Sequence, residues 1–273
     1  VQRYETSLKH TRDFVWETYH KKDVLLDEVS RQFIEDYEFW LKTEKKCCHN
    51  TATKYLKNFK KIIRIALAKG WMKNDPFLEI RFSLDKVEPD FLEDSEIQKL
   101  ISKEIDIPRL SQVRDIFVFC CFTGLAFSDI HGLRKEHIVE DSNGVRWIRK
   151  GRQKTKIMCN IPLMEIPLKI LEKYSTNEYC KKHGVLFPVL CNQKMNAYLK
   201  ELADICGIKK TLTTHVGRHT FATFALANGV SIESVAKMLG HTNVQMTRHY
   251  ARVLDRTVIR EMSQIKMDFH ISI

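Results

Sequence analysis

The chain has 273 residues and a formal net charge of +11, from 45 Lys and Arg against 34 Asp and Glu. Its 44% of hydrophobic residues is ordinary for a water-soluble globular protein, and no apolar run reaches the length of a membrane span. The positive charge favours a polyanionic partner. We expect nucleic acid and not an acidic membrane, because the sequence has no lipidation motif and no amphipathic segment of the membrane type.

The eight cysteines do not form a metal-binding or disulfide framework. No CxxC pair is present, and Cys47-Cys48-His49 is a poor zinc cluster, because adjacent cysteines do not readily bind one ion and no second pair follows. Cys120 and Cys121 fall inside an apolar helix, where buried thiols are common. We therefore expect reduced thiols and a cytoplasmic location.

The length is sufficient for two domains with their own cores. Residues 1–80 read as helical, with helices over 2–19 and 26–42 and a third that is capped by Asn50 or Thr51. Residues 81–90 break this pattern and are expected to form a linker, so that 91–273 form the second domain. Because the chain begins with Val1 and not Met, we expect a segment upstream of it.

The third helix carries a stripe of cations at the spacing i, i+3, i+7 and i+10 that contains no acid. A solvated face is the usual reading of such a stripe, but the lack of any acid makes a helix lying along DNA phosphates at least as good an interpretation. The four candidate DNA-binding residues are Lys54, Lys57, Lys61 and Arg64.

The second domain reads as helical with one small sheet. An apolar helix over about 110–122 precedes a short one over 127–133. Asn143-Gly144 is a hairpin signal between strands at 137–139 and 145–148, and a second turn near Gly151 to Thr155 leads to a third strand at 157–163. Helices resume at about 165–173 and 192–207. The predicted fold class is mainly α with a small antiparallel β-sheet.

Four groups suited to phosphodiester chemistry lie between Thr213 and the last tyrosine: His215, Arg218, His241 and Tyr250. The fork of Arg matches two phosphate oxygens, His can donate to phosphate or exchange a proton, and Tyr can act as a covalent nucleophile. A single such residue is usually a surface or core residue. Here, however, each falls at an element boundary: His215 is expected in the turn before a helix opened by Arg218, and Gly240 ends the next helix just before His241.

The order H-x-x-R, then L-G-H, then a tyrosine nine residues further on resembles the tyrosine recombinase (phage-type integrase) family. The resemblance covers nearly the whole chain: 1–80 is similar to the family's helical core-DNA-binding domain and 91–273 to its catalytic domain. The stretch from Arg114 to Asp129, with Thr123-Gly124-Leu125-Ala126, looks especially like integrases of Bacteroidetes mobile elements.

The resemblance implies an enzyme that cuts one DNA strand at a time without a cofactor or metal. Tyr250 would join the 3′ phosphate and release a 5′ hydroxyl. Arg218 and His215 would hold the non-bridging oxygens, and His241 would add a hydrogen bond. Lys154 on the strand hairpin would protonate the leaving 5′ oxygen, with Lys156 as the fallback.

One position departs from the family pattern: the first catalytic arginine should follow Thr-Gly-Leu, where this chain has Ala126. Arg152 is the favoured substitute, because it stands two positions before Lys154, and alternate residues of an extended chain point to the same side. A turn between them would break that relation. Arg114 is the second candidate, although it could instead hold a structural ion pair.

Two other functions stay open. A non-catalytic DNA-binding protein on the same fold would not need Tyr250, His215, Arg218 and Lys154 in place, and a type IB topoisomerase would share the chemistry without exchanging partners. For a recombinase we expect double-stranded DNA and a homo-oligomer, a tetramer, as partners. The amphipathic stretch 255–267 is expected to pack on its own domain or on a neighbouring subunit.

Overall fold

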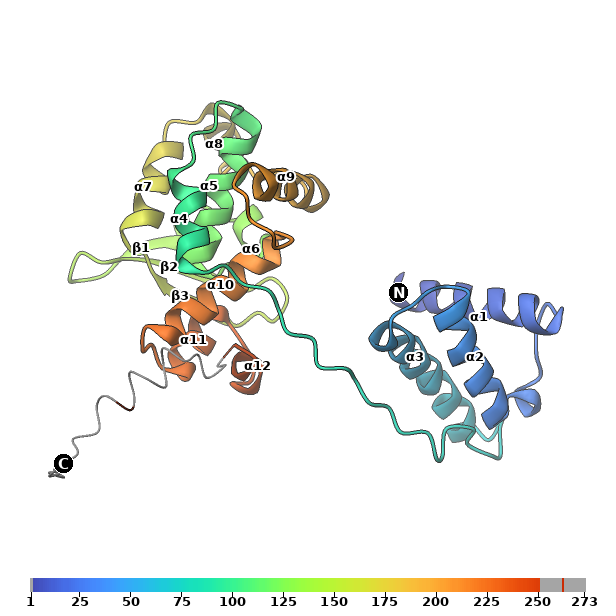
Figure 1. Cartoon of the computed structure of the whole chain (residues 1–273). Helices are drawn as coiled ribbons and strands as arrows, with labels where there is room; N and C mark the ends of the chain where they lie inside the picture. Colours follow the sequence, from blue (N-terminus) through green and yellow to red (C-terminus); the bar gives the residue numbers. More distant parts are fainter. Residues whose placement is uncertain (1, 251–261, 263–273) are drawn as a thin grey trace, which may run out of the picture. The chain divides into compact units, whose positions relative to one another are not determined.

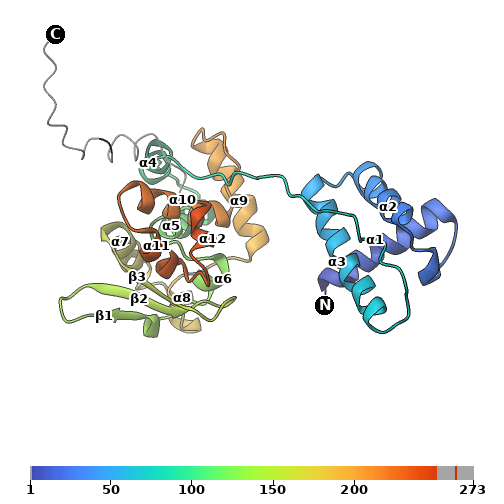
Figure 2. The same ribbon diagram turned by 90° about the horizontal axis from the view of Figure 1, so that it is seen from below.

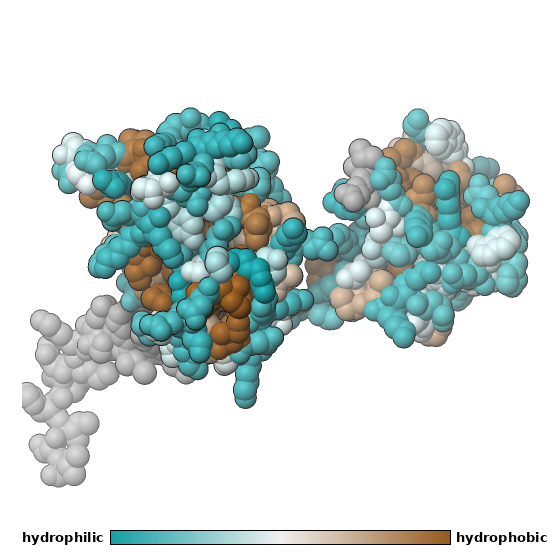
Figure 3. Space-filling view, turned by 90° about the horizontal axis from the view of Figure 1, so that it is seen from above, coloured by the Kyte–Doolittle hydropathy of each residue, from teal (hydrophilic) through white to brown (hydrophobic). Residues whose placement is uncertain are grey.

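The computed structural model describes residues 2–250 and 262, which form two compact units divided between Glu88 and Pro89. The described part is helical apart from one three-stranded antiparallel sheet, so the predicted fold class is confirmed. No helix in the described ranges is both long and apolar enough to cross a bilayer. Hydrophilic residues cover most of the face of each unit that Figure 3 shows.

Unit 1 is built around aromatic side chains. Its helices are α1 (Gln2–Tyr19), the short 3₁₀ helix η1 (Leu26–Glu28), α2 (Arg31–Thr43) and α3 (His49–Ala68) (Figures 1 and 2). Phe14 is fully buried against Phe33, Tyr37 and Trp40 at ring-centroid distances of 5.1, 4.9 and 5.7 Å. Burial of large rings is the main stabilising contribution that so small a unit can make.

Some sequence predictions for this unit are wrong in detail. The helix expected over 26–42 is interrupted, because the Ser30 side chain accepts a hydrogen bond from Phe33 N and starts α2 there. Phe39 of α2 is 69% exposed and lies outside the core. In α3 the N-cap is Cys48 and not Asn50 or Thr51. Leu56 is buried in the core, whereas Ile62 is half exposed.

The predicted linker is mostly attached to one unit or the other. Asn50 exchanges two hydrogen bonds with the Asp85 backbone, at 2.9 and 2.8 Å, and Phe82 packs against Phe77. On the other side of the division, Asp90 O lies 3.2 Å from His219 Nδ1, and just after the predicted linker Leu92 N donates to Thr220 Oγ1 at 2.9 Å.

Unit 2 is organised around α5 (Pro108–Thr123), which runs through its middle with α4, α7, α9 and α10 packed around it (Figure 1). The apolar sequence of α5 is buried on nearly every side, as the sequence predicted. The other helices of this unit are α4 (Asp94–Ser102), α6 (Phe127–His131), η2 (Lys135–His137), α7 (Glu165–Tyr174), α8 (Glu178–His183), α9 (Asn192–Ile205), α10 (Thr214–Ala227), α11 (Ile232–Leu239) and α12 (Gln245–Arg248).

The sheet has the order β1 (Ile138–Glu140), β2 (Arg146–Gly151), β3 (Met158–Pro162). The predicted hairpin is present, but its loop is longer than the two residues Asn143-Gly144, because the Asp141 carboxylate accepts hydrogen bonds from Asn143 N and Val145 N. The register aligns Ile138, Ile148 and Ile161 across the three strands. This row anchors the sheet to the core, and the turn that joins β2 to β3 extends from it.

Candidate active site

Helix α10 brings the first three polar groups of the site together. The Thr213 side chain accepts a hydrogen bond from Val216 N, so that the helix begins at Thr214. The expectation that His215 lies in a turn before the helix is therefore wrong. His215, Arg218 and His219 all project from its first two turns, where residues three and four apart are neighbours.

Arg218 lies at the centre of the site and is only 2% exposed. Its Nη1 donates to Gly124 O at 2.7 Å, and its Nη2 to Leu239 O at 2.6 Å. No carboxylate lies within salt-bridge distance of it in the described ranges. Burial, followed by the nearby charge of Arg152, lowers the pKa of Arg218 to about 10, so the side chain remains a cation at neutral pH.

The two carbonyl groups that hold Arg218 come from helix ends with left-handed glycines. Gly124 ends α5 at φ 66° and Gly240 ends α11 at φ 60°. A Cβ at Gly124 would lie 2.4 Å from a Phe221 ring carbon, and one at Gly240 would lie 2.7 Å from Cys159 Sγ. Both turns therefore require glycine, for conformation and for space.

His241 follows Gly240 and contacts Arg218 directly. Its Nε2 accepts from Arg218 Nη2 at 3.1 Å, because an arginine can only donate. Nδ1 then carries the proton and donates to Thr247 Oγ1 at 2.8 Å. Burial, then Arg218 and Arg152, lowers the pKa of His241 to about 4, so the ring is neutral at pH 7.

Tyr250 follows α12 and lies between two histidine rings. The His219 ring centroid is 5.2 Å from that of Tyr250, and the His241 ring is nearly parallel to it at 6.3 Å. The tyrosine also packs on the apolar cluster that contains Phe221 and Leu239. Burial raises the pKa of the Tyr250 phenol, whereas the charges of Arg218 and Arg152 oppose that rise.

The turn after β2 brings two more cations to the site. Arg152 is only 8% exposed, and its charge lowers the pKa values of His215 and His241 as well as that of Arg218. Lys154 is exposed, and its charge contributes to lowering the pKa of His215, after burial and the two arginines. Lys156 is also exposed and has φ 62°.

The sequence predicted that strand alternation brings Arg152 to the site, and this is wrong. Residues 153–155 form a turn, so Arg152 and Lys154 do not share an extended strand. Arg152 instead reaches its buried position through Asp129, whose Oδ2 lies 3.8 Å from Arg152 Nε, while Oδ1 accepts from Gln153 N at 2.9 Å. The buried Oδ2 and Nε atoms have no hydrogen-bond partner among the described residues.

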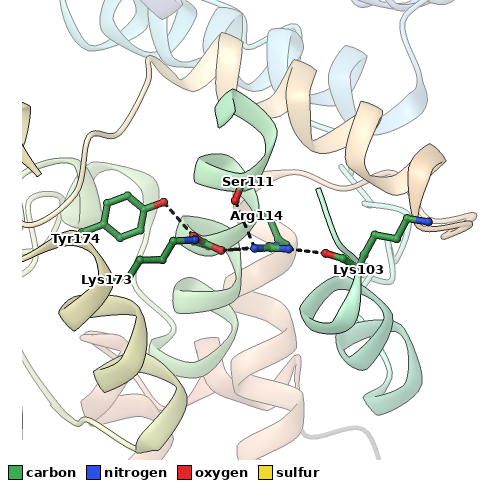
Figure 4. A network of polar contacts seen from close by, with 6 residues as sticks. Lys103, Ser111, Arg114, Lys173 and Tyr174 are labelled. Carbon is green, nitrogen blue, oxygen red and sulfur yellow. Dashed lines mark hydrogen bonds and ion pairs between the residues drawn. The ribbon is translucent and has the colours of Figure 1, made fainter. Parts of the chain in front are cut away.

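Arg114 belongs to a separate polar network (Figure 4). Its guanidinium donates to Asp115 Oδ1 at 3.1 and 3.0 Å and to Lys103 O at 2.6 Å. The buried Asp115 also accepts from Lys173 and Tyr174, at 2.5 and 3.0 Å. Since α5 rises about 1.5 Å per residue, this network lies about 15 Å along the helix from Gly124. Arg114 therefore has the structural ion pair that the sequence left open.

Three residues of the site are absent from the candidates that the sequence suggested: His219, Asp129 and Thr247. The spacing of His215 and His219, four residues apart on a helix, is a signal that could have indicated the first. Nothing in the local sequence distinguishes Thr247, which is fully buried and fixes the His241 tautomer.

Comparisons with known proteins show which family the chain belongs to. Residues 90–257 match the model of the phage integrase family, and residues 1–83 match the phage integrase SAM-like domain. A tyrosine recombinase of Pseudothermotoga lettingae is 30% identical over 86% of this chain and 82% of its own length. The tyrosine recombinase XerD of Oceanobacillus iheyensis is 27% identical, with 86% and 81% covered. The chain belongs to the phage integrase family, the tyrosine recombinases.

Solved structures show the same fold. A lambda integrase dimer bound to a COC′ core site has a TM-score of 0.72 at 18% identity, with 91% of this chain and 87% of that chain covered. The XerH recombinase bound to a palindromic difH substrate, a post-cleavage complex, has a TM-score of 0.74 at 15% identity, with 97% and 79% covered. At these identities the likeness concerns the fold alone.

Proposed function

We propose that this chain is a site-specific DNA recombinase of the integrase kind in which Tyr250 is the nucleophile. The observation that carries the proposal is the convergence on one point of a tyrosine, a buried arginine held by two carbonyl groups, and two histidines from separate elements. A protein that only bound DNA would have no need to bury the cation Arg218 beside a tyrosine, since burying a charge is costly.

The reaction would proceed by in-line transfer. The Tyr250 oxygen forms a bond to phosphorus as the bond to the 5′ oxygen breaks, the phenolic proton passes to solvent water, and Lys154 supplies a proton to the leaving oxygen. Arg218 and His215 would hold the non-bridging oxygens. Cations placed where charge develops in the transition state commonly provide the largest catalytic contribution. Attack by a 5′ hydroxyl on the phosphotyrosine would rejoin the strand.

His241 would have to change its hydrogen bonds to assist. Its Nε2 now accepts from Arg218, so it has no free N–H for a phosphate. A phosphate oxygen that replaced Nε2 as the acceptor of Arg218 would release this nitrogen. With Thr247 then donating to Nδ1, the Nε2–H form could donate to the same phosphate.

Arg152 supports the proposal as the substitute for the arginine absent at Ala126. It is buried beside Arg218, and its charge acts on Arg218, His241 and Tyr250. Arg114 is a weaker candidate, because its donors are engaged by Asp115 and Lys103.

The partners are part of the proposal. Double-stranded DNA is expected from the net charge of +11 and the exposed cations of α3, and from the DNA-bound recombinases of the same fold. We also propose that the protein assembles as a tetramer on DNA and is cytoplasmic. Its mobile element would be one of those found in Bacteroidetes. An integrase of the transposon Tn1549, in complex with a circular intermediate DNA, is among the similar structures, with a TM-score of 0.66 and 18% identity.

The test is covalent capture on nicked duplexes of random sequence. The wild-type chain should form an SDS-resistant adduct, and sequencing of the attached 3′ ends would reveal the DNA site. Tyr250→Phe removes only a hydroxyl and should bind DNA with no adduct; an adduct that persists in this variant would refute the assignment of Tyr250. No adduct with the wild-type chain would favour the DNA-binding alternative. Relaxation of supercoiled DNA by monomers would favour the topoisomerase alternative.

A further inference from the structure

His219 contacts the proposed nucleophile and yet has no part in holding the phosphate. It follows Arg218 on α10 and lies one turn after His215. Its ring packs against the His215 ring at 4.3 Å and 66°, and against the Tyr250 ring at 5.2 Å and 52°. The side chain is partly buried between these two rings.

A hydrogen bond to the backbone of Asp90 fixes the orientation of the His219 ring. Its Nδ1 lies 3.2 Å from the backbone oxygen of Asp90. Because a carbonyl oxygen only accepts, Nδ1 carries the proton and donates, which sets both the tautomer and the plane of the ring. Asp90 is the second residue of unit 2, and the neighbouring Leu92 N is held in turn by the buried hydroxyl of Thr220.

Tyr250 has little else to hold it. No hydrogen bond to its hydroxyl exists among the described residues, and its backbone N donates to Thr247 O in the short turn after α12. Within the described residues its ring is therefore positioned by packing, against the rings of His219 and His241 and against the apolar cluster. A nucleophile must be placed within a fraction of an ångström of its target, and a misplacement of about 1 Å costs about 100-fold in rate.

We propose that His219 is a positioning residue for the nucleophile: a neutral ring, tied to Asp90, that forms one wall of the Tyr250 position. Burial, then the neighbouring His215, keeps it neutral at pH 7, so that it adds no charge beside Arg218 and Arg152. This inference rests on the proposed role of Tyr250 as the nucleophile.

Three substitutions separate the packing of the His219 ring on Tyr250 from its hydrogen bond to Asp90. His219→Ala removes both, His219→Asn keeps a donor that can reach Asp90 without the ring, and His219→Phe keeps the ring without the donor. We expect the rate of adduct formation at saturating protein to fall about 100-fold in the Ala and Asn variants. The Phe variant should recover most of that loss. The affinity for the same DNA should stay within about twofold of the wild-type value in all three, because none of these atoms is placed on the phosphate.

The matched control is His249→Ala. His249 adjoins Tyr250 in the sequence, is exposed and has no ring contact with it among the described residues, so this variant should cleave at the wild-type rate. The probe is a nicked duplex carrying the junction sequence recovered from wild-type adducts on the random library. Thermal unfolding of each variant identifies any loss that comes from misfolding, and the Phe variant, which preserves the packing, keeps the test valid if Ala does not fold.

The outcomes distinguish this inference from the function on which it rests. If the wild-type chain forms no adduct, or Tyr250→Phe still does, the proposed function is wrong. If the wild-type chain forms the adduct and His219→Ala does so at an equal rate, only the role of His219 is overturned. An equal loss of rate in His219→Phe and His219→Ala would show that the ring does not position Tyr250. A loss of DNA affinity that matches the loss of rate would show that His219 acts in DNA binding and not in positioning.

Discussion

At the scale of single residues, the site is dominated by the cost of burying Arg218. A cation removed from water is costly unless its donors are satisfied. The donors of Arg218 are satisfied by two backbone carbonyl groups and by Nε2 of a neutral histidine, all of which accept from it. An aspartate in the same place would neutralise the charge. Carbonyl groups leave it available for an incoming phosphate.

Arg152 and Arg114 should respond differently to truncation. Arg152→Ala removes a cation beside the proposed phosphate position, so we expect adduct formation to fall about 100- to 1000-fold with DNA affinity nearly unchanged. Arg114→Ala deprives the buried Asp115 of one partner, which should lower the free energy of unfolding by about 1–3 kcal/mol and leave the rate intact. Single-turnover cleavage and urea unfolding of both variants provide the check. A slow Arg114→Ala beside a normal Arg152→Ala would transfer the role to Arg114.

At the scale of elements, the sequence predicted most helices and all three strands, because each has a strong pattern of its own. The sequence was less informative where contacts with a residue far away in the chain determine the local structure. The predicted turn after β2 is present at residues 153–155, but nothing near Gly151 indicates what holds it. Asp129 Oδ1 accepts from Gln153 N, and Thr155 Oγ1 donates to Gly240 O at 3.1 Å. Helix α10 begins at Thr214 and not at Arg218, because Thr213 caps it.

The site was predictable in its residue types and less so in its geometry. His215, Arg218, His241 and Tyr250 follow one another in a recognisable order, so the sequence singles them out. The hydrogen bonds of Arg218 depend on the backbone oxygens of Gly124 and Leu239, which are 94 and 21 residues away in the chain. No periodicity in a single chain carries such information, and this is also why Thr247 could not be predicted.

Helix α3 provides a prediction at the same scale. Lys54, Lys57, Lys61 and Arg64 are all exposed, and no ion pair engages any of them among the described residues. Changing Lys57, Lys61 and Arg64 to Gln should weaken binding to every DNA sequence alike. The slope of log K against log salt should become shallower by about 0.9 for each phosphate that is no longer neutralised by a cation.

The control for α3 is a triple Gln variant at Lys21, Lys42 and Lys169. These lysines are also exposed, but each is paired with a glutamate, at 2.5, 2.6 and 2.5 Å. The net charge of the two variants is equal, so a slope that changes by the same amount in both would mean that α3 is only a solvated face.

At the scale of the whole molecule, the partly buried histidines His219 and His241 couple stability to pH. Burial lowers the pKa of both His219 and His241 to about 4, whereas an unfolded histidine has a pKa of about 6.5. Between these values the unfolded chain binds more protons, so the free energy of unfolding should fall as the pH decreases from about 6.5 to about 4 and be insensitive to these groups above it. His10, His137 and His215, with lowered pKa values, add in the same direction.

Urea unfolding at about pH 7.5 and about pH 5 measures this effect. In the double variant His219→Phe with His241→Asn, the loss of stability between the two pH values should be smaller than in the wild-type chain. Carboxylates contribute equally to both proteins and cancel in the comparison. An equal loss in both would mean that these two histidines do not control the acid sensitivity.

The last prediction concerns assembly, which strand exchange requires. Residues 255–267 lie outside the described ranges except for Met262, but their sequence has apolar positions at Val258, Ile259, Met262 and Ile265. Unit 2 has an apolar groove of about 510 Å³ whose lining includes Phe122, Trp147, Met164, Phe224 and Met238. We expect the tail of one copy to occupy this groove on a second copy when both are bound to DNA.

Deleting residues from Thr257 onward should therefore preserve the binding of a single copy to a half-site and abolish the cooperativity of binding to a full site. Met164→Glu should reproduce that loss, because it places a charge in the groove at a residue that is 64% exposed and has no part in the core. Gel-shift titrations on half and full sites measure both effects. A mixture of the two variants shows whether the tail binds the groove of its own copy or that of a second copy. If the tail acts between copies, each variant supplies what the other lacks, so the mixture should recover part of the cooperativity. Unchanged cooperativity after the deletion would show that the tail does not join the copies.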